Sequence, residues 1–184
     1  MKYLSIFLIL ILIGCKNDTK KELMTDSEID PSVYKMWASF VESNPENTID
    51  ELPESWFFHD NKVDADRLAA LTLNGKKKAT TSGLYNWYVE AKADLPQIGT
   101  KHIVTDFNGK AKAIIEITSV DTIPFNQMTE SLAALDMGTD TEPLGKWRKA
   151  HWSFFKSIMN ENSEEPTEDM LIVFERFEMI WKMK

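Results

Sequence analysis

Apolar residues recur at helical spacing in the first half of the chain. Asp30 suits the cap of a helix and Pro31 suits its first turn. The residues that follow repeat every three or four positions and predict one buried helix face, made of Val33, Met36, Trp37, Phe40 and Val41. A second helix is predicted over residues 64–74, with Asp64 as its cap and Gly75 at its end.

Farther along the chain the hydrophobic period becomes that of a strand. Residues 101–120 contain two β-rich runs around Asn108 and Gly109, and this dipeptide is the strongest short signal for a β-hairpin. If these two residues form the centre of the turn, Lys101 pairs across the hairpin with Glu116.

The last third of the chain combines two helices with a final strand. Residues 131–137 predict a small helix, and a long helix follows the polar loop at 138–143. The apolar stripe of the long helix comprises Trp147, His151, Phe154 and Ile158, flanked by Phe155. Residues 170–181 predict a buried strand. This order of elements predicts an α+β fold around a small antiparallel sheet.

The N-terminus has the pattern of a targeting segment. The chain starts with a positively charged residue, and an apolar run then continues to Cys15, the single cysteine. A run this short matches a secretion signal better than a membrane span. We expect residues 1–15 to be a lipoprotein-type signal peptide with lipidation at Cys15, which predicts a membrane-anchored, extracytoplasmic protein. A plain signal peptide or a short anchor is the alternative. Residues 16–28 read as a flexible tether, and residues 29–184 as one domain.

Charge and motifs narrow the possible partners. The net charge of −8 disfavours long duplex DNA, and Lys76, Lys77 and Lys78 form the only dense basic cluster. The chain has no P-loop, no dinucleotide-type glycine pattern and no zinc motif, so we expect neither a cofactor nor a metal. Its three histidines are widely scattered, and His151 on the apolar stripe is best interpreted as a core residue.

Residues 75–88 place lysines directly before a cluster of large side chains. Thr80 follows the lysines, and a short helix is predicted from Ser82, with Tyr85 and Trp87 near its start. Aromatic side chains beside charged groups are typical of sites that stack a base and hold a polar ligand. Lys77 also fits an ordinary solvated lysine at a helix end, and Thr80 fits a strand or a cap.

Taken together, these segments resemble ASCH-domain proteins. The similarity covers roughly residues 33–181 and depends on the Gly-x-Lys-x-x-Thr pattern at residues 75–80, the Ile-Glu-Ile-Thr run around Glu116, and the sequence WRKAHWSFF. The resemblance implies a PUA-like fold, in which flanking helices surround a small antiparallel β-barrel. Several acidic residues expected before the tryptophan helix are replaced in the loop at 136–142.

The resemblance also implies a function and a set of site residues. Relatives bind nucleobases, nucleotides or RNA in a cleft, and some hydrolyse the amide of N4-acetylcytidine without a metal. Carried over by motif, the catalytic residues are Lys77, Thr80 and Glu116. The sequence itself, and not the resemblance, suggests the ligand-binding residues: Tyr85 and Trp87 of the aromatic cluster would stack a base, and Arg148 would reach a phosphate.

Three functions remain open. The first is an amidohydrolase acting on a nucleoside-like ligand of the N4-acylcytidine type. The second is a non-catalytic module for a small nucleoside-like ligand or short RNA, and the third is an interaction lipoprotein with a vestigial cleft. A cross-strand ion pair with Lys101 would explain Glu116 without catalysis.

Overall fold

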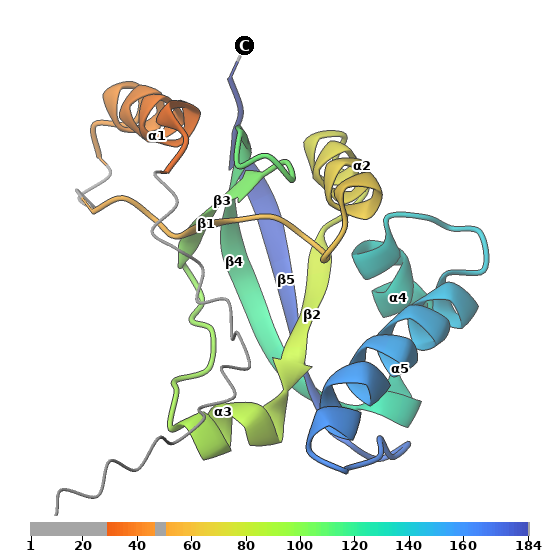
Figure 1. The fold of residues 1–184 in the computed structure, drawn as a ribbon. Helices are drawn as coiled ribbons and strands as arrows, with labels where there is room; N and C mark the ends of the chain where they lie inside the picture. Colours follow the sequence, from red (N-terminus) through yellow and green to blue (C-terminus); the bar gives the residue numbers. More distant parts are fainter. Residues whose placement is uncertain (1–28, 47–50, 184) are drawn as a thin grey trace, which may run out of the picture.

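The computed structural model describes residues 29–46 and 51–183, which form one sheet surrounded by helices (Figure 1). The strands are β1 (Ser55–Trp56), β2 (Ala79–Leu84), β3 (Lys101–Thr105), β4 (Ala111–Pro124) and β5 (Leu171–Trp181). The helices are α1 (Pro31–Ser43), α2 (Lys62–Leu73), α3 (Tyr85–Ala91), α4 (Glu130–Met137) and α5 (Pro143–Glu161), with a 3-10 turn at Phe125–Gln127. The α+β class predicted from the sequence is confirmed.

The sheet is mixed and open, which corrects the expectation of a closed antiparallel barrel. Its strand order is β1-β3-β4-β5-β2, so β1 and β2 are the two edges and do not pair with each other. The short β1 runs parallel to β3, whereas every other pairing is antiparallel. A barrel requires hydrogen bonds between its first and last strands. Here the side chains of Trp56 on β1 and Thr80 on β2 instead line a common cleft.

The predicted hairpin is formed by β3 and β4, with Lys101 opposite Glu116 as expected. Its turn is longer than two residues, because the Asp106 amide donates to the Lys110 carbonyl across it. Gly109 has a φ of +82°, which suits glycine at this position of the turn. A register shift beside Thr105 accommodates the longer connection.

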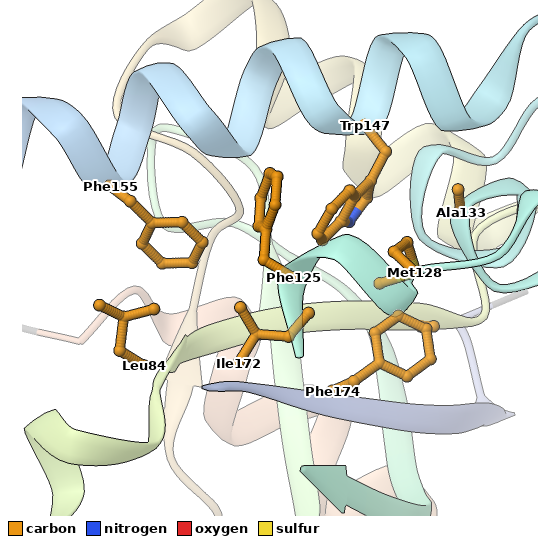
Figure 2. Packing of buried hydrophobic residues seen from close by; sticks show 9 residues of the cluster. Leu84, Phe125, Met128, Ala133, Trp147, Phe155, Ile172 and Phe174 are labelled. Carbon is orange, nitrogen blue, oxygen red and sulfur yellow. The ribbon is translucent and has the colours of Figure 1, made fainter. Parts of the chain in front are cut away.

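Helices α4 and α5 cover one face of the sheet (Figures 1 and 2). In Figure 2, Trp147 and Phe155 project from α5 toward Phe125, Ile172 and Phe174. These side chains are almost completely buried. The predicted stripe of the long helix is therefore shifted: Phe154 is 49% exposed, and the fully buried side chains of α5 are Trp147 and Phe155.

The remaining elements form two smaller apolar clusters. The predicted face of α1 packs against Ile103 and Ile114, as expected from its helical spacing. Ala69 of α2 and Phe58, in the segment between β1 and α2, pack against the sheet around Ile117 and Phe177. Among the described residues, no helix is long and apolar enough to cross a membrane.

Two element boundaries differ from the sequence prediction. Helix α2 begins at Lys62 and is capped by Asn61, whose side chain accepts a hydrogen bond from the Asp64 amide. Ser82 lies within β2, and the following helix starts at Tyr85. Strand β2 extends this far because it hydrogen-bonds to β5 from Ala79 to Leu84.

Candidate functional site

Lys77 is buried where α2 leads into β2. Its side chain is 3% exposed, and its amine donates hydrogen bonds to the Asp136 carboxylate and carbonyl, both at 2.7 Å, and to the Ala79 carbonyl at 2.8 Å. These three bonds use every N–H of an ammonium group. Phe58 lies 4.7 Å from the Lys77 nitrogen, measured to the ring centroid. Lys77 is therefore a positioned charge rather than a surface lysine.

Asp136, at the end of α4, is the partner of this lysine. Its second carboxylate oxygen accepts hydrogen bonds from the Thr81 hydroxyl at 2.9 Å and the Trp147 indole at 3.0 Å. Burial would raise the pKa of Asp136, but the Lys77 charge and the hydrogen bonds from Lys77 and Thr81 hold it below its ordinary value. Three parts of the chain that are distant in sequence are thus joined by one ion pair.

Local backbone structure explains why Lys77 and Asp136 meet. The Lys77 amide donates to the Leu71 carbonyl at the end of α2, and the Lys78 amide donates to the Leu135 carbonyl in α4. Gly138 ends α4 with a φ of +63°, in the left-handed region that favours glycine. A Cβ atom at Gly138 would lie 3.1 Å from the Leu71 side chain and 3.3 Å from the Lys77 amide nitrogen. The ends of α2 and α4 are therefore fixed against each other.

A cavity of about 290 Å³ opens above this ion pair. Lys77 and Asp136 lie at its buried side, and its lining includes Thr80 and Arg67, together with the half-exposed Phe154. Arg67 is held at the rim by Asp64, with 2.8 Å between nitrogen and oxygen. The cavity combines charged groups with an exposed aromatic ring.

His151 also lines this cavity, one turn after Trp147 on α5. One ring nitrogen, Nδ1, lies 2.9 Å from the Trp147 carbonyl oxygen. A carbonyl can only accept, so Nδ1 carries a proton in this hydrogen bond. Burial lowers the pKa of His151, although the Asp136 carboxylate opposes this effect. In the neutral form of this tautomer the lone pair is on Nε2, which lies 3.6 Å from the Asp136 carboxylate.

A larger cleft, of about 520 Å³, adjoins the cavity. The two share Phe58, His59 and Thr80 in their linings. Aromatic side chains contribute to the walls of the cleft, and several titratable groups line it, among them the buried His102 and Glu175. Burial lowers the pKa of His102 and raises that of Glu175. Thr80, on the edge strand β2, thus contributes to both hollows.

The structure brings together only some of the residues that sequence suggested. Lys77 and Thr80 line one cavity, whereas Glu116 forms a 2.8 Å ion pair with Lys101 across the hairpin and lines neither hollow. The carboxylate that joins Lys77 is Asp136 instead. Glu116 lies apart because it occupies the central strand β4, directly opposite Lys101.

The three expected ligand-binding residues lie outside both hollows. Tyr85 is half-buried on α3, and Trp87 packs edge-on against Phe155 in the core. Arg148 pairs with Glu168 at 3.3 Å on the outer side of α5. Neither hollow is lined by any of the three. Trp87 therefore packs against the aromatic core and does not face a ligand site.

Sequence reasoning missed Asp136, His151 and Glu175 as site residues. Asp136 lies at the start of the loop whose acidic residues were noted, but its contact with Lys77 spans 59 positions of sequence. His151 follows Trp147 by one helical turn, which equally suits a core histidine. Glu175 gives a local signal, since it is a lone acid within the apolar run IVFERF. No group of three or more potential metal ligands occurs within residues 29–46 and 51–183.

A family model and two crystal structures are similar to this chain. A family model described as "ASCH domain" matches residues 54–181. An ASCH domain from Lactobacillus crispatus JV V101, known from a crystal structure, is 31% identical with a TM-score of 0.75, covering 84% of this chain and 97% of its own. A crystal structure of an Enterococcus faecalis V583 protein is 29% identical with a TM-score of 0.70, covering 81% of this chain and 88% of its own. Among proteins with curated descriptions, none matches the chain.

Proposed function

The chain belongs to the ASCH domain family, and on that premise we propose that it binds a nucleobase-like ligand, as a nucleoside or a short RNA, across the two joined hollows. The observation that carries this proposal is the junction at Thr80. On one side of Thr80 lies a cavity with buried charge, and on the other a cleft with aromatic walls. A ligand with a planar ring and a polar substituent matches both environments.

The buried ion pair supports a binding role for the cavity. Replacing such a pair by apolar residues of similar volume is often neutral or stabilising, so stability alone does not explain its presence. Lys77 and Asp136 instead fix the positions of Thr81 and Trp147 at the wall beside Thr80. We interpret the pair as a rigid support for the polar end of the site.

The aromatic walls support a planar ligand. Trp56 and Phe58 meet edge-to-face with 4.9 Å between ring centroids, and Tyr88 lines the same cleft. Stacking of a base on an aromatic side chain contributes about 1–3 kcal/mol. The acidic balance of the chain, −8, favours a small ligand or a short RNA over a long duplex.

Isothermal titration calorimetry of the full chain with cytidine, uridine, N4-acetylcytidine and a short single-stranded RNA tests this proposal. We expect saturable binding of at least one of these ligands. Thr80→Val keeps the side-chain shape but removes the hydroxyl at the junction, so affinity should fall by about fivefold to tenfold, the value of one hydrogen bond. Thr167→Val, at an exposed threonine outside both hollows, is the matched control. The absence of binding by all four ligands would contradict the proposal.

Hydrolysis of an N-acylated nucleoside is a second candidate function, and His151 is the observation that favours it. Removing a proton from water requires a base that is unprotonated near physiological pH. The Lys77 amine already donates three hydrogen bonds, whereas Nε2 of His151 has a lone pair at the cavity. Glu116, in its ion pair with Lys101, is a less suitable participant.

Release of acetate from N4-acetylcytidine by the full chain tests this candidate. We expect turnover to be lost in His151→Gln and retained in Lys156→Gln, an exposed residue of the same helix that lines neither hollow. Binding of N4-acetylcytidine without release of acetate would exclude hydrolysis and leave the binding function intact.

We also propose that Cys15 is lipidated and that residues 16–28 tether the domain to a membrane outside the cytoplasm. This proposal is supported only by the sequence pattern, because these residues lie outside the described part of the chain. An anchored binding module of this kind would encounter nucleosides or short RNA as scavenged material.

A further inference from the structure

Glu175 is a carboxyl group buried on β5 without a cationic partner. The residue is 5% exposed and lies opposite Thr80 of β2 and Val120 of β4. No basic side chain in the described part of the chain contributes charge to its environment. The neighbouring Arg176 does not compensate, because its guanidinium pairs with Asp121 at 3.2 Å.

Burial without a cation favours the uncharged form of this group. Transferring an ionised carboxylate from water into a protein interior is costly unless a counter-charge accompanies it. The pKa of Glu175 is accordingly raised by burial, while a hydrogen bond with Ser82 works in the opposite direction. A protonated carboxyl has one O–H donor beside one carbonyl acceptor.

The alternation of side chains along β5 places Glu175 on the face of the sheet that lines the larger cleft. Side chains two apart on a strand share a face, and Phe177 on that face packs against Phe58. Glu175 and Thr80 both line the cleft, as does Ser82. The carboxyl group therefore faces the space that a ligand would occupy, rather than the apolar core formed with α4 and α5.

The surroundings of Glu175 combine aromatic rings with polar groups. Trp56 lies 5.7 Å from the His102 ring, centroid to centroid, and Tyr88 belongs to the same lining. Nδ1 of His102 is buried and has no hydrogen-bond partner among the described residues. A buried polar nitrogen without a partner is rare in folded proteins and indicates an unfilled contact. The cleft thus offers aromatic faces and a few polar atoms that are free to bind.

We propose that Glu175 reads the edge of the base in this cleft, its hydroxyl donating to a ring acceptor while its carbonyl accepts from the adjacent N–H of the ligand. The ligand class is a neutral planar heterocycle with an acceptor next to a donor, as in pyrimidine nucleosides. This inference rests on the proposed binding function and adds the residue that confers specificity.

Two substitutions at Glu175 test whether affinity depends on the donor and acceptor of this side chain or only on its size and shape. Glutamine has the same neighbouring donor and acceptor as a protonated carboxyl, whereas methionine has similar length but neither group. The ligands are uridine and cytidine, and the measurement is calorimetry on the full chain. Glu178→Gln, at an exposed glutamate on the same strand, is the control. Both apolar and amide replacements avoid a buried charge, so both variants are expected to fold.

We expect Glu175→Gln to retain affinity to within about threefold and Glu175→Met to lose about tenfold or more, as for two hydrogen bonds. Equal losses in both variants would mean that an ionised carboxylate is required and would overturn the inference. Unchanged affinity in both would overturn it as well, while leaving the proposed binding function standing. If neither nucleoside binds the unsubstituted chain, the inference fails; failure of N4-acetylcytidine and RNA as well would remove the proposed function.

Discussion

At the scale of single residues, the Lys77–Asp136 pair organises the site. Its two side chains are 3% and 4% exposed, and between them they contact β2, α4 and α5. Each charge is compensated only by the other and by a few hydrogen bonds. The pair is therefore much more sensitive to loss of one member than its exposed counterparts on the surface.

Removing one member of this pair should strongly destabilise the domain. We expect Lys77→Met or Asp136→Asn to lower the free energy of unfolding by about 3–5 kcal/mol, because each leaves its partner buried and uncompensated. The double variant should lose less than the sum of the two. Chemical denaturation of the full chain measures this, with exposed Lys78→Met as the control. Additive losses would show that the two groups act independently.

The Lys101–Glu116 pair should behave differently, since Glu116 is 34% exposed. We expect Glu116→Gln to change the free energy of unfolding by less than about 1 kcal/mol and to leave nucleoside affinity unchanged. Calorimetry and denaturation of the same preparation test both parts. A large loss of nucleoside affinity would mean that Glu116 belongs to the ligand site and would contradict its assignment to a surface ion pair.

Glu175 predicts a specific dependence of stability on pH. Its pKa is raised in the folded state above its ordinary value of 4.5. The folded state therefore holds this proton more tightly, and the resulting stability is present below that value and lost as pH rises through the folded pKa. The unfolding free energy of Glu175→Gln relative to the unsubstituted chain should thus increase from about pH 4 to about pH 8. A constant difference would mean that the pKa of Glu175 is the same in the folded and unfolded states.

The sequence alone indicates which residues belong to the site more reliably than it indicates which side chains they contact. The motif around Lys77 and Thr80 was visible because its residues are adjacent in sequence. Asp136 was not chosen as the acid, because nothing local to α4 indicates a lysine 59 positions away. The Lys101–Glu116 pairing was predictable, since a hairpin turn sets the register of its strands.

At the scale of elements, the ends of α2 and α4 hold the site together. Gly138 is the element boundary on which this arrangement depends, because its left-handed backbone brings α4 against Leu71 and Lys77. The periodic segments α1, α4 and β5 were predicted from their apolar spacing. The boundary between β2 and α3 was not, because pairing with the distant β5 extends the strand through Ser82.

Two glycine-to-alanine substitutions should have opposite effects. Gly138→Ala should lower the free energy of unfolding by at least about 1–2 kcal/mol, since alanine is strained at positive φ and its Cβ would press on Leu71. Gly145→Ala, in the exposed first turns of α5 with open space around it, should raise it by about 0.5–1 kcal/mol. Thermal or chemical denaturation distinguishes the two. Equal effects would contradict the role given to the Gly138 turn.

At the scale of the whole molecule, the open sheet explains why a cleft exists. Its edge strands β1 and β2 do not pair, and side chains from both line the larger hollow. Whether strands close into a barrel depends on long-range pairing that local sequence patterns do not encode. The resemblance to ASCH domains therefore indicated the correct family but not the open, mixed sheet.

The anchor is tested on the full chain produced in a host that processes lipoproteins. We expect the unsubstituted protein to fractionate with membranes and Cys15→Ser to be lost from them, because Cys15 is the single cysteine of the sequence. Mass spectrometry of the mature N-terminus provides the second measurement. Membrane association that survives Cys15→Ser, with an uncleaved apolar segment, would identify a plain anchor instead.

Nuclear magnetic resonance titration of the full chain with cytidine, uridine and N4-acetylcytidine tests the binding claim most directly, because it locates the ligand as well as detecting it. Saturable shifts should occur at the backbone amides of Phe58, His59 and Thr80, which both hollows share, and extend to Glu175. Shifts confined to the outer side of α5 around Arg148 and Glu168, or no saturable shifts at all, would contradict a ligand site at the junction.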